Sequence, residues 1–140
     1  MSRAPATVLR GQGPAVAAVA AGGVLGALAR AGVGLLVPVP PGGFPWGTLG
    51  INVLGSLLMG VLVVVVTEVR TAHPLVRPFL GTGVLGGFTT FSTFAVDAQT
   101  LLGGGHRATA FAYLAATIVG AVGACALAMA VTRRVAGVRQ

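Results

Sequence analysis

The residues best suited to binding an ion lie in one short stretch, residues 86–94, which reads GGFTTFSTF. Adjacent glycines followed by hydroxyl and β-branched side chains make it a poor continuous helix, so we expect a break near residues 86–90. Unwound backbone within a membrane helix often coordinates a small cation through carbonyl oxygens that the helix no longer uses. The carbonyl oxygens of Gly86 and Thr89 are therefore candidate ligands of a cation.

The same stretch carries aromatic rings that could contact an anion. Phe91 and Phe94 are three residues apart, so they share one face of a helix. The edge of a phenyl ring is weakly positive, and rings presented edge-on could accompany a small anion without holding it as a full charge would. The alternative is that both rings pack in a core or face lipid. Likewise, the hydroxyls of Thr90, Ser92 and Thr93 could line that path or bond to carbonyls one turn earlier.

Further polar side chains fall inside apolar stretches of the chain. Asn52 could form an interhelical hydrogen bond or present its NH₂ group to an anion, and the sequence favours neither. Arg30 either extends to the lipid headgroups or attracts anions into a vestibule. The charge of Asp97 would oppose an anion path, so we expect it in an ion pair or as a cap near the break.

The composition indicates which elements must position these side chains. Of the 140 residues, 55% are hydrophobic and 8% are charged, whereas soluble domains carry roughly 25% charged residues. Arg, Lys, Asp and Glu are absent from residues 11–29, 31–67, 78–96 and 108–132. Because a spanning helix needs about 20 apolar residues, we predict an all-α membrane protein. Its single domain, residues 1–140, would contain four transmembrane helices at about 14–37, 47–67, 79–102 and 107–132, the third broken near mid-membrane.

The arginines are distributed unevenly between the two ends of this predicted bundle. The end that holds both termini and the 68–78 hinge carries seven of them: Arg3, Arg10, Arg70, Arg77, Arg133, Arg134 and Arg139. The other end carries Arg107 in its loops, and Arg30 lies inside the first segment. This bias predicts a multi-pass protein of the cell membrane with both termini in the cytoplasm. We expect these arginines to contact anionic lipid headgroups rather than nucleic acid.

The sequence carries no signature of an enzyme, because it has no nucleophile–base pair, metal-binding cluster or phosphate loop. His73 and His106 fall in predicted loops, and Cys125 is expected to be a small packing residue. Small residues recur at a spacing of four, which lets membrane helices approach closely. These pairs are Gly22/Gly26, Ser56/Gly60, Gly83/Gly87 and Ala116/Gly120.

Three segments of the chain resemble the CrcB/Fluc family of fluoride channels. They are residues 86–94, the first-helix pattern Gly22–Arg30 and the second-helix pattern Gly47–Ser56. The resemblance implies a small four-helix protein that assembles as an antiparallel, dual-topology dimer. It implies two narrow fluoride pathways and one structural sodium ion at the dimer interface. The implied activity is passive export of fluoride down its electrochemical gradient, which relieves fluoride toxicity in the cytoplasm.

The resemblance also implies roles for individual residues. The carbonyls of Gly86 and Thr89 would bind the sodium ion, and Phe91 and Phe94 would face the fluoride ions. The remaining pathway residues would be Asn52, Ser92, Thr93, Thr48, Tyr113, Thr117 and Arg30. Tyr113 and Thr117 are looser matches, because the fourth helix has no sharp motif. Asp97 stands where many relatives carry Glu.

The arginine bias departs from what a homodimer of this kind requires. In an antiparallel homodimer each chain inserts in both orientations, which calls for a nearly balanced arginine count on the two sides. We therefore expect a heterodimer with a second, homologous chain of opposite bias, with the homodimer as the alternative.

Two other functions remain open on the sequence. One is a small proton-coupled multidrug exporter, although its first helix would need a carboxylate where this sequence has Arg30. The other is a non-conducting partner subunit of a membrane complex, which the small-residue spacing would suit.

Overall fold

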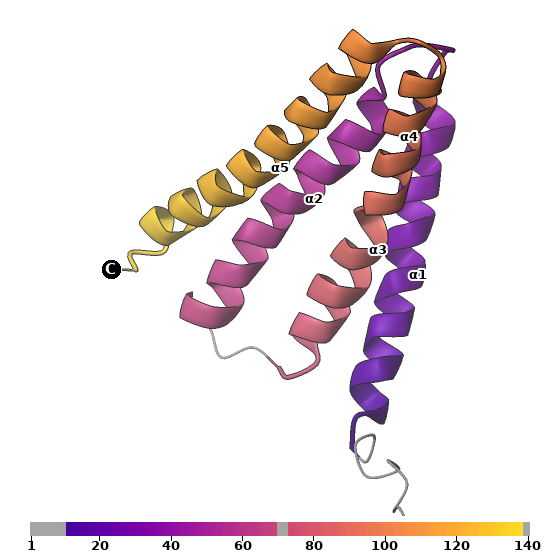
Figure 1. Ribbon diagram of the computed structural model, residues 1–140. Coiled ribbons are helices and arrows are strands. Elements are labelled where there is room, and N and C mark those ends of the chain that lie inside the picture. Colours follow the sequence, from indigo (N-terminus) through magenta and orange to yellow (C-terminus); the bar gives the residue numbers. More distant parts are fainter. Residues whose placement is uncertain (1–10, 70–72, 139–140) are drawn as a thin grey trace, which may run out of the picture.

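The computed structural model describes residues 11–69 and 73–138, so Arg3, Arg10, Arg70 and Arg139 lie outside the described residues. Four helical stretches are long and apolar enough to cross a membrane: Gly13–Leu36, Trp46–Val69, Arg77–Gly103 and Arg107–Val135. This confirms the predicted all-helical chain with four such helices (Figure 1).

The first helix, α1 (Gly13–Leu36), has 24 residues. At 1.5 Å per residue it is about 36 Å long, enough for a hydrocarbon core of about 30 Å. Pro14 lies in its first turn, where a missing N–H costs nothing. Prolines at 38, 40 and 41 follow its end and prevent its continuation.

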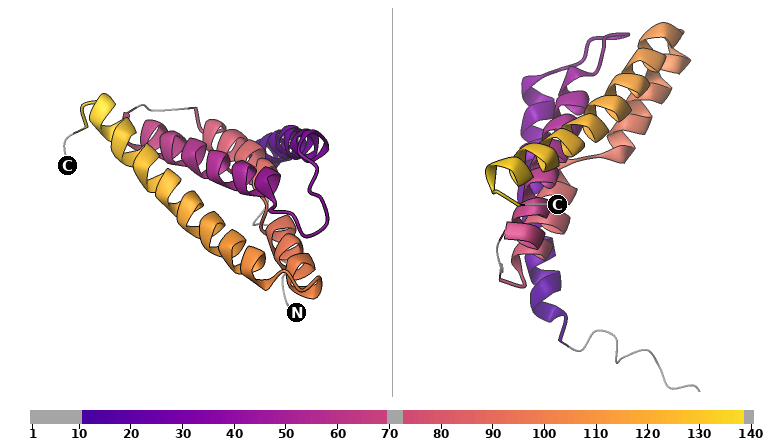
Figure 2. Two further views of the ribbon diagram at one scale, coloured as in Figure 1. Left: turned by 90° about the horizontal axis from the view of Figure 1, so that it is seen from above. Right: turned by 90° about the vertical axis from the view of Figure 1, so that its left-hand side faces the viewer.

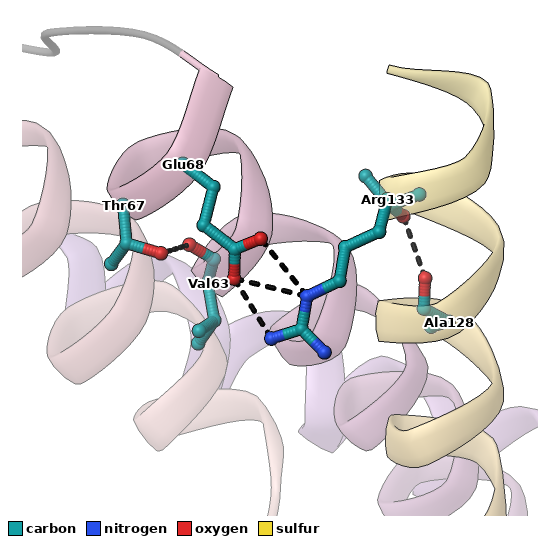
Figure 3. Close-up of polar contacts among 6 residues, drawn as sticks. Val63, Thr67, Glu68, Ala128 and Arg133 are labelled. Atoms are coloured by element: carbon teal, nitrogen blue, oxygen red, sulfur yellow. Dashed lines mark hydrogen bonds and ion pairs between the residues drawn. The ribbon is translucent and has the colours of Figure 1, made fainter. Parts of the chain in front are cut away.

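The second helix begins at Trp46, directly after Pro45, and α2 (Trp46–Val64) continues as a π-helical turn, η1 (Val65–Val69). The predicted hinge from residue 68 therefore starts too early, since Glu68 is still helical. The carboxylate of Glu68 accepts hydrogen bonds from Arg133 Nε at 2.9 Å and Nη2 at 2.8 Å (Figure 3). This ion pair ties the end of α2 to the fourth spanning helix.

The third spanning stretch has three parts: η2 (Arg77–Leu85, π-helical), α3 (Gly86–Phe88) and α4 (Phe91–Gly103). Gly86 is helical, with φ −64° and ψ −36°. Thr89, with ψ 158°, and Thr90, with φ −150° and ψ 123°, have extended backbone. The glycines thus stay in the helix, and the extended pair Thr89–Thr90 follows them.

The helices are arranged around α2. The long helix α5 (Arg107–Val135) packs mainly along α2, while α1 packs on η2 and α3. Seen from above, α2 lies between α5 and the pair formed by α1 and α3 (Figure 2, left). The α1–α2 and α4–α5 loops lie at one end, and α5 diverges from α1 toward the other (Figure 1). The side chains that could form a site together therefore come from α2 and from the helices on its two sides.

Glycines allow α1 to contact the third stretch backbone to backbone. A Cβ added at Gly26 would lie 2.7 Å from the Phe88 nitrogen, and one at Gly83 would lie 2.9 Å from the Gly22 Cα. Both distances are too short for real atoms, so these positions require glycine. The expectation of close packing at Gly22/Gly26 and Gly83/Gly87 is confirmed. This contact fixes α1 against α3 immediately before the extended pair.

Candidate ion pathway

The extended pair Thr89–Thr90 is held by side chains from two other helices. Asn52 on α2 donates from Nδ2 to the Thr90 carbonyl at 3.1 Å, and its Oδ1 accepts from the Thr90 N–H at 2.9 Å. Arg30 on α1 donates from Nη1 to the Thr89 carbonyl at 3.3 Å. These bonds replace those that helical backbone would make within itself, and unpaired backbone is costly in a membrane. Of the two roles considered for Asn52, the interhelical hydrogen bond is present.

The carbonyl of Gly86 loses its helical partner through the same arrangement. In a continuous helix the Thr90 N–H would donate to the Gly86 carbonyl four residues earlier, but here it donates to Asn52. Gly86 is exposed. A Cβ added at this residue would have the Gly81 oxygen, at 3.7 Å, as its nearest neighbour. The predicted cation ligands therefore differ: Gly86 is an exposed residue whose carbonyl lacks the Thr90 N–H, whereas the Thr89 oxygen accepts a hydrogen bond from a guanidinium.

Thr90 also begins the helix that follows it. Its Oγ1 accepts from the Thr93 backbone N–H at 3.1 Å and contacts the Thr93 and Ser92 hydroxyls at 3.0 and 3.2 Å. A threonine in this position is a favourable N-cap, which explains why α4 starts at Phe91. Within residues 86–94, the hydroxyl that bonds to a carbonyl one turn earlier is that of Thr89, which donates to the Leu85 carbonyl at 2.9 Å. Thr90 is buried, while Ser92 and Thr93 are exposed.

A cavity of about 340 Å³ brings several predicted residues together. We call it the phenylalanine cavity, and its lining includes Asn52, Ser56, Thr90, Phe91, Phe94 and Thr117. The Thr117 Oγ1 is buried and has no hydrogen-bond partner within the described part of the chain. A buried hydroxyl without a partner calls for an explanation, and a water or ion bound beside this cavity would be one. All the described residues lining this cavity are uncharged.

The two phenylalanines share the predicted helix face but not the same environment. Their ring centroids are 5.7 Å apart. Phe94 is 8% exposed and packs against Tyr113, with centroids 5.4 Å apart, whereas Phe91 is 81% exposed. Phe94 is thus part of the core, and Phe91 presents its ring to the surroundings of the chain.

Asp97 binds hydroxyl groups rather than a cation. Its Oδ2 accepts from Thr48 Oγ1 at 2.7 Å and from the Tyr113 hydroxyl at 3.2 Å. The predicted ion pair or cap is therefore wrong: within residues 11–69 and 73–138 the ion pair found is Glu68–Arg133, and Thr90 is the cap. Charge-assisted hydrogen bonds supply the stabilisation that a cation would have given. Tyr113 is fully buried behind Phe94, so it supports the phenylalanine cavity without lining it.

A second cavity, of about 350 Å³, shares Thr90 with the first as a lining residue. We call it the arginine cavity, and its lining includes Arg30, Thr48, Thr90, Thr93 and Asp97. Arg30 is half-buried there, so its guanidinium points to this cavity and to Thr89 instead of extending away from the protein. Thr90 lines both cavities, a role that its sequence position did not reveal. A threonine directly before a helical run could have indicated the cap.

Comparison with known proteins agrees with this arrangement. The family model described as CrcB-like protein, Camphor Resistance (CrcB), matches residues 17–129. The protein named fluoride-specific ion channel FluC 1 of Streptomyces coelicolor is 56% identical over 131 residues, which cover 94% of this chain and 85% of that one. The protein named FluC 2 of Streptomyces avermitilis is 58% identical over 83% of this chain and 75% of that one. The protein named fluoride-specific ion channel FluC of Ruegeria is 45% identical over 84% of this chain and 93% of that one. The chain therefore belongs to the CrcB family.

Proposed function

We propose that this chain forms a fluoride-specific channel, through which fluoride leaves the cytoplasm passively. Relatives at 45–58% identity bear the name fluoride-specific ion channel. The observation that carries the proposal is the buried hydroxyl of Thr117, which has no partner among residues 11–69 and 73–138 and belongs, like Phe94, to a residue that lines the phenylalanine cavity. A hydroxyl donor can replace part of the hydration shell that a small anion loses on entering the protein.

The phenylalanine cavity offers fluoride several weak donors instead of one strong charge. Asn52 uses one of its two amide hydrogens on Thr90 and keeps the other for a ligand. Thr117 adds a hydroxyl, and the ring edges of Phe91 and Phe94 add weakly positive surface. Conduction needs an ion to be bound strongly enough to enter and weakly enough to leave. Arg30, in the neighbouring arginine cavity, supplies the positive potential that draws anions toward this path.

Passive flow suits the charges of the site. Asp97 is held by two hydroxyls and does not line the phenylalanine cavity, so no carboxylate stands on that part of the path to exchange a proton. A negative-inside membrane potential favours anion exit by about 2.3 kcal/mol per charge per 100 mV. We therefore infer a channel rather than a coupled transporter or an enzyme.

We also propose that the Gly86 and Thr89 carbonyls, together with those of a second chain, hold a sodium ion at a subunit interface. The donor set fits, because both groups are neutral oxygens and the Gly86 oxygen lacks its helical N–H partner. Hard cations prefer about six or more oxygen ligands, so two carbonyls from one chain leave most of the coordination to a partner. A bound sodium would supply positive charge at the extended pair.

The proposed partner is a homologous chain inserted in the opposite orientation, giving an antiparallel heterodimer. The exposure of the Phe91 ring and of Gly86 supports a second chain that covers them and completes the site. The arginine bias supports cytoplasmic termini for this chain and a partner of opposite bias. Streptomyces avermitilis has relatives named FluC 2 and FluC 3, so homologous chains do coexist in one organism.

Fluoride efflux from liposomes tests this function. The full chain would be reconstituted alone and together with a homologous chain of opposite arginine bias, and release of fluoride and of chloride would be measured with ion-selective electrodes. We expect fluoride but not chloride release, with the larger signal from the pair. Equal release of both anions, or no release from either preparation, would refute the proposal.

A further inference from the structure

We propose that Arg30 is a positioning residue that controls how tightly sodium is held at the extended pair. Its guanidinium donates to the Thr89 carbonyl, which is one of the two oxygens assigned above to sodium. Two positive groups would then share one oxygen atom. The inference rests on the sodium site of the proposed function and concerns its affinity.

Helix packing fixes the place of Arg30 beside Thr89. Gly26 brings the backbone of α1 against the Phe88 nitrogen, and Arg30 follows Gly26 by one helical turn. The arginine therefore reaches the residue directly after Phe88. The contact is a consequence of the glycine packing and not of a flexible surface arginine.

Arg30 forms no ion pair with any of the described residues. Asp97 lines the same cavity, but its carboxylate accepts from Thr48 and Tyr113, and it forms no ion pair with Arg30 among the described residues. The single hydrogen bond from Arg30 to the Thr89 carbonyl is 3.3 Å long, at the weak end of the usual range. The guanidinium thus brings positive charge to this oxygen, and Asp97 in the same cavity lies beyond ion-pair distance from it.

A second cation on the same carbonyl would be repelled by that charge. Repulsion between like charges grows as the surroundings become less polar, and the hydrogen bond between Arg30 and this carbonyl is partly buried. A guanidinium that donates to the oxygen also competes for its lone pairs. Arg30 therefore lowers the affinity for sodium and keeps the extended pair in place when sodium is absent.

Sodium binding to variants of Arg30 tests this inference. Arg30→Gln keeps an amide donor but removes the charge, and Arg30→Lys keeps the charge; Arg77→Gln removes an exposed arginine at the other end of the third stretch as a control. Each full chain would be purified with its partner chain. Its thermal stability would then be titrated with sodium chloride against N-methylglucamine chloride, and its sodium content measured by atomic spectrometry after dialysis.

We expect Arg30→Gln to lower the sodium concentration at half-maximal stabilisation by about tenfold, equivalent to 1.4 kcal/mol. Arg30→Lys and Arg77→Gln should stay within about threefold of the parent, well below that tenfold step. If Arg30→Gln does not fold, Arg30→Met, which removes the charge and the donor, should lower the same midpoint. An unchanged or raised midpoint in the neutral variants, or a parent complex that takes up no sodium, would overturn the inference. Because no step of this assay measures fluoride, shifted midpoints without fluoride release would refute the channel function and leave the inference standing.

Discussion

Two threonines on α5 differ in the way that separates a ligand-binding hydroxyl from a structural one. Thr132 donates to the Ala128 carbonyl at 2.7 Å, as hydroxyls in apolar helices usually do. Thr117 is buried and has no partner among the described residues. The sequence located Thr117 as a candidate through a loose resemblance, but it could not reveal that the hydroxyl is unpartnered. That property depends on rotamer and packing.

Replacing Thr117 by valine should therefore reduce fluoride flux without unfolding the protein. Valine has nearly the same shape, and the hydroxyl that it removes pairs with none of the described residues. A hydrogen bond to a charged group contributes about 1.5–3 kcal/mol, which corresponds to about a 10- to 100-fold slower flux. The rate of fluoride efflux from liposomes measures this loss, and Thr117→Ser, which restores a hydroxyl, should recover most of the parent flux.

The matched control is Thr132→Val on the same helix. Its hydroxyl is already bonded to a carbonyl, so its loss should leave flux unchanged within about twofold, far less than the 10-fold minimum expected at Thr117. Similar losses in both variants would show that the buried hydroxyl has no particular role.

The partners of Asp97 mark the limit of prediction from residue types. Thr48 and Tyr113 are separated from it by 49 and 16 residues, so only the packing of three helices brings them together. The sequence therefore suggested a cation or a helix end as the partner, and both suggestions were wrong. Phe91 and Phe94 illustrate the same limit. Helical spacing predicts that they share one face, but it cannot show that Phe94 is buried and Phe91 exposed.

Among the elements, the third spanning stretch shows what glycine contributes. The sequence placed a break near residues 86–90 on the low helix propensity of its glycines and of its β-branched and hydroxyl residues; within that range Gly86 and Gly87 are helical, and the extended residues are Thr89 and Thr90. The glycines serve close contact with α1: a Cβ at Gly87 would lie 3.0 Å from the Gly23 Cα. What distinguishes the extended pair is the side chains that bind it, and these come from α1 and α2.

Asn52 should be the main support of the extended pair. Asn52→Leu removes both hydrogen bonds to Thr90 and leaves its backbone N–H and C=O without partners. Each buried unpartnered group costs about 1–3 kcal/mol. We expect exchange of the Thr90 amide hydrogen to accelerate at least tenfold, measured by hydrogen–deuterium exchange on peptides covering residues 86–94.

Ser56→Ala is the control for this change, since Ser56 lines the same cavity but makes no hydrogen bond to Thr89 or Thr90. Its exchange at Thr90 should match that of the parent chain. Unchanged protection in Asn52→Leu would mean that the extended pair is held by other contacts.

The packing of α1 on α3 should depend on single glycines in a position-specific way. Gly26→Ala places a methyl group 2.7 Å from the Phe88 nitrogen, and backbone cannot move aside cheaply. Gly23→Ala on the same helix meets nothing within 4 Å and gains up to about 1 kcal/mol of helix propensity. Thermal unfolding of the purified variants should therefore show a lower midpoint for Gly26→Ala and an equal or higher one for Gly23→Ala. Equal midpoints would contradict the close backbone contact.

For the whole molecule, the gaps between charged residues predicted the number of spanning helices and their approximate limits. The physical reason is simple: a helix that crosses lipid cannot easily carry charge, so charges gather at its ends. The same reasoning missed the helical state of Glu68, because the charge there is neutralised by Arg133, which is separated from it by 65 residues. Orientation in the membrane is a property of the charge pattern of the whole chain rather than of the fold.

The arginine bias should give this chain one orientation, with both termini in the cytoplasm. A periplasmic-active alkaline phosphatase fused after residue 140 should be inactive, and a green fluorescent protein at the same position should fluoresce. Inserting arginines in the 38–45 loop while replacing Arg133 and Arg134 by glutamine reduces the bias, and should raise the phosphatase signal. Because an antiparallel dimer then needs a differently oriented partner, native mass spectrometry after co-expression with a homologue of opposite bias should detect the heterodimer in excess over the homodimer. Equal phosphatase and fluorescence signals from the unmodified chain would instead mean that it inserts both ways and can pair with itself.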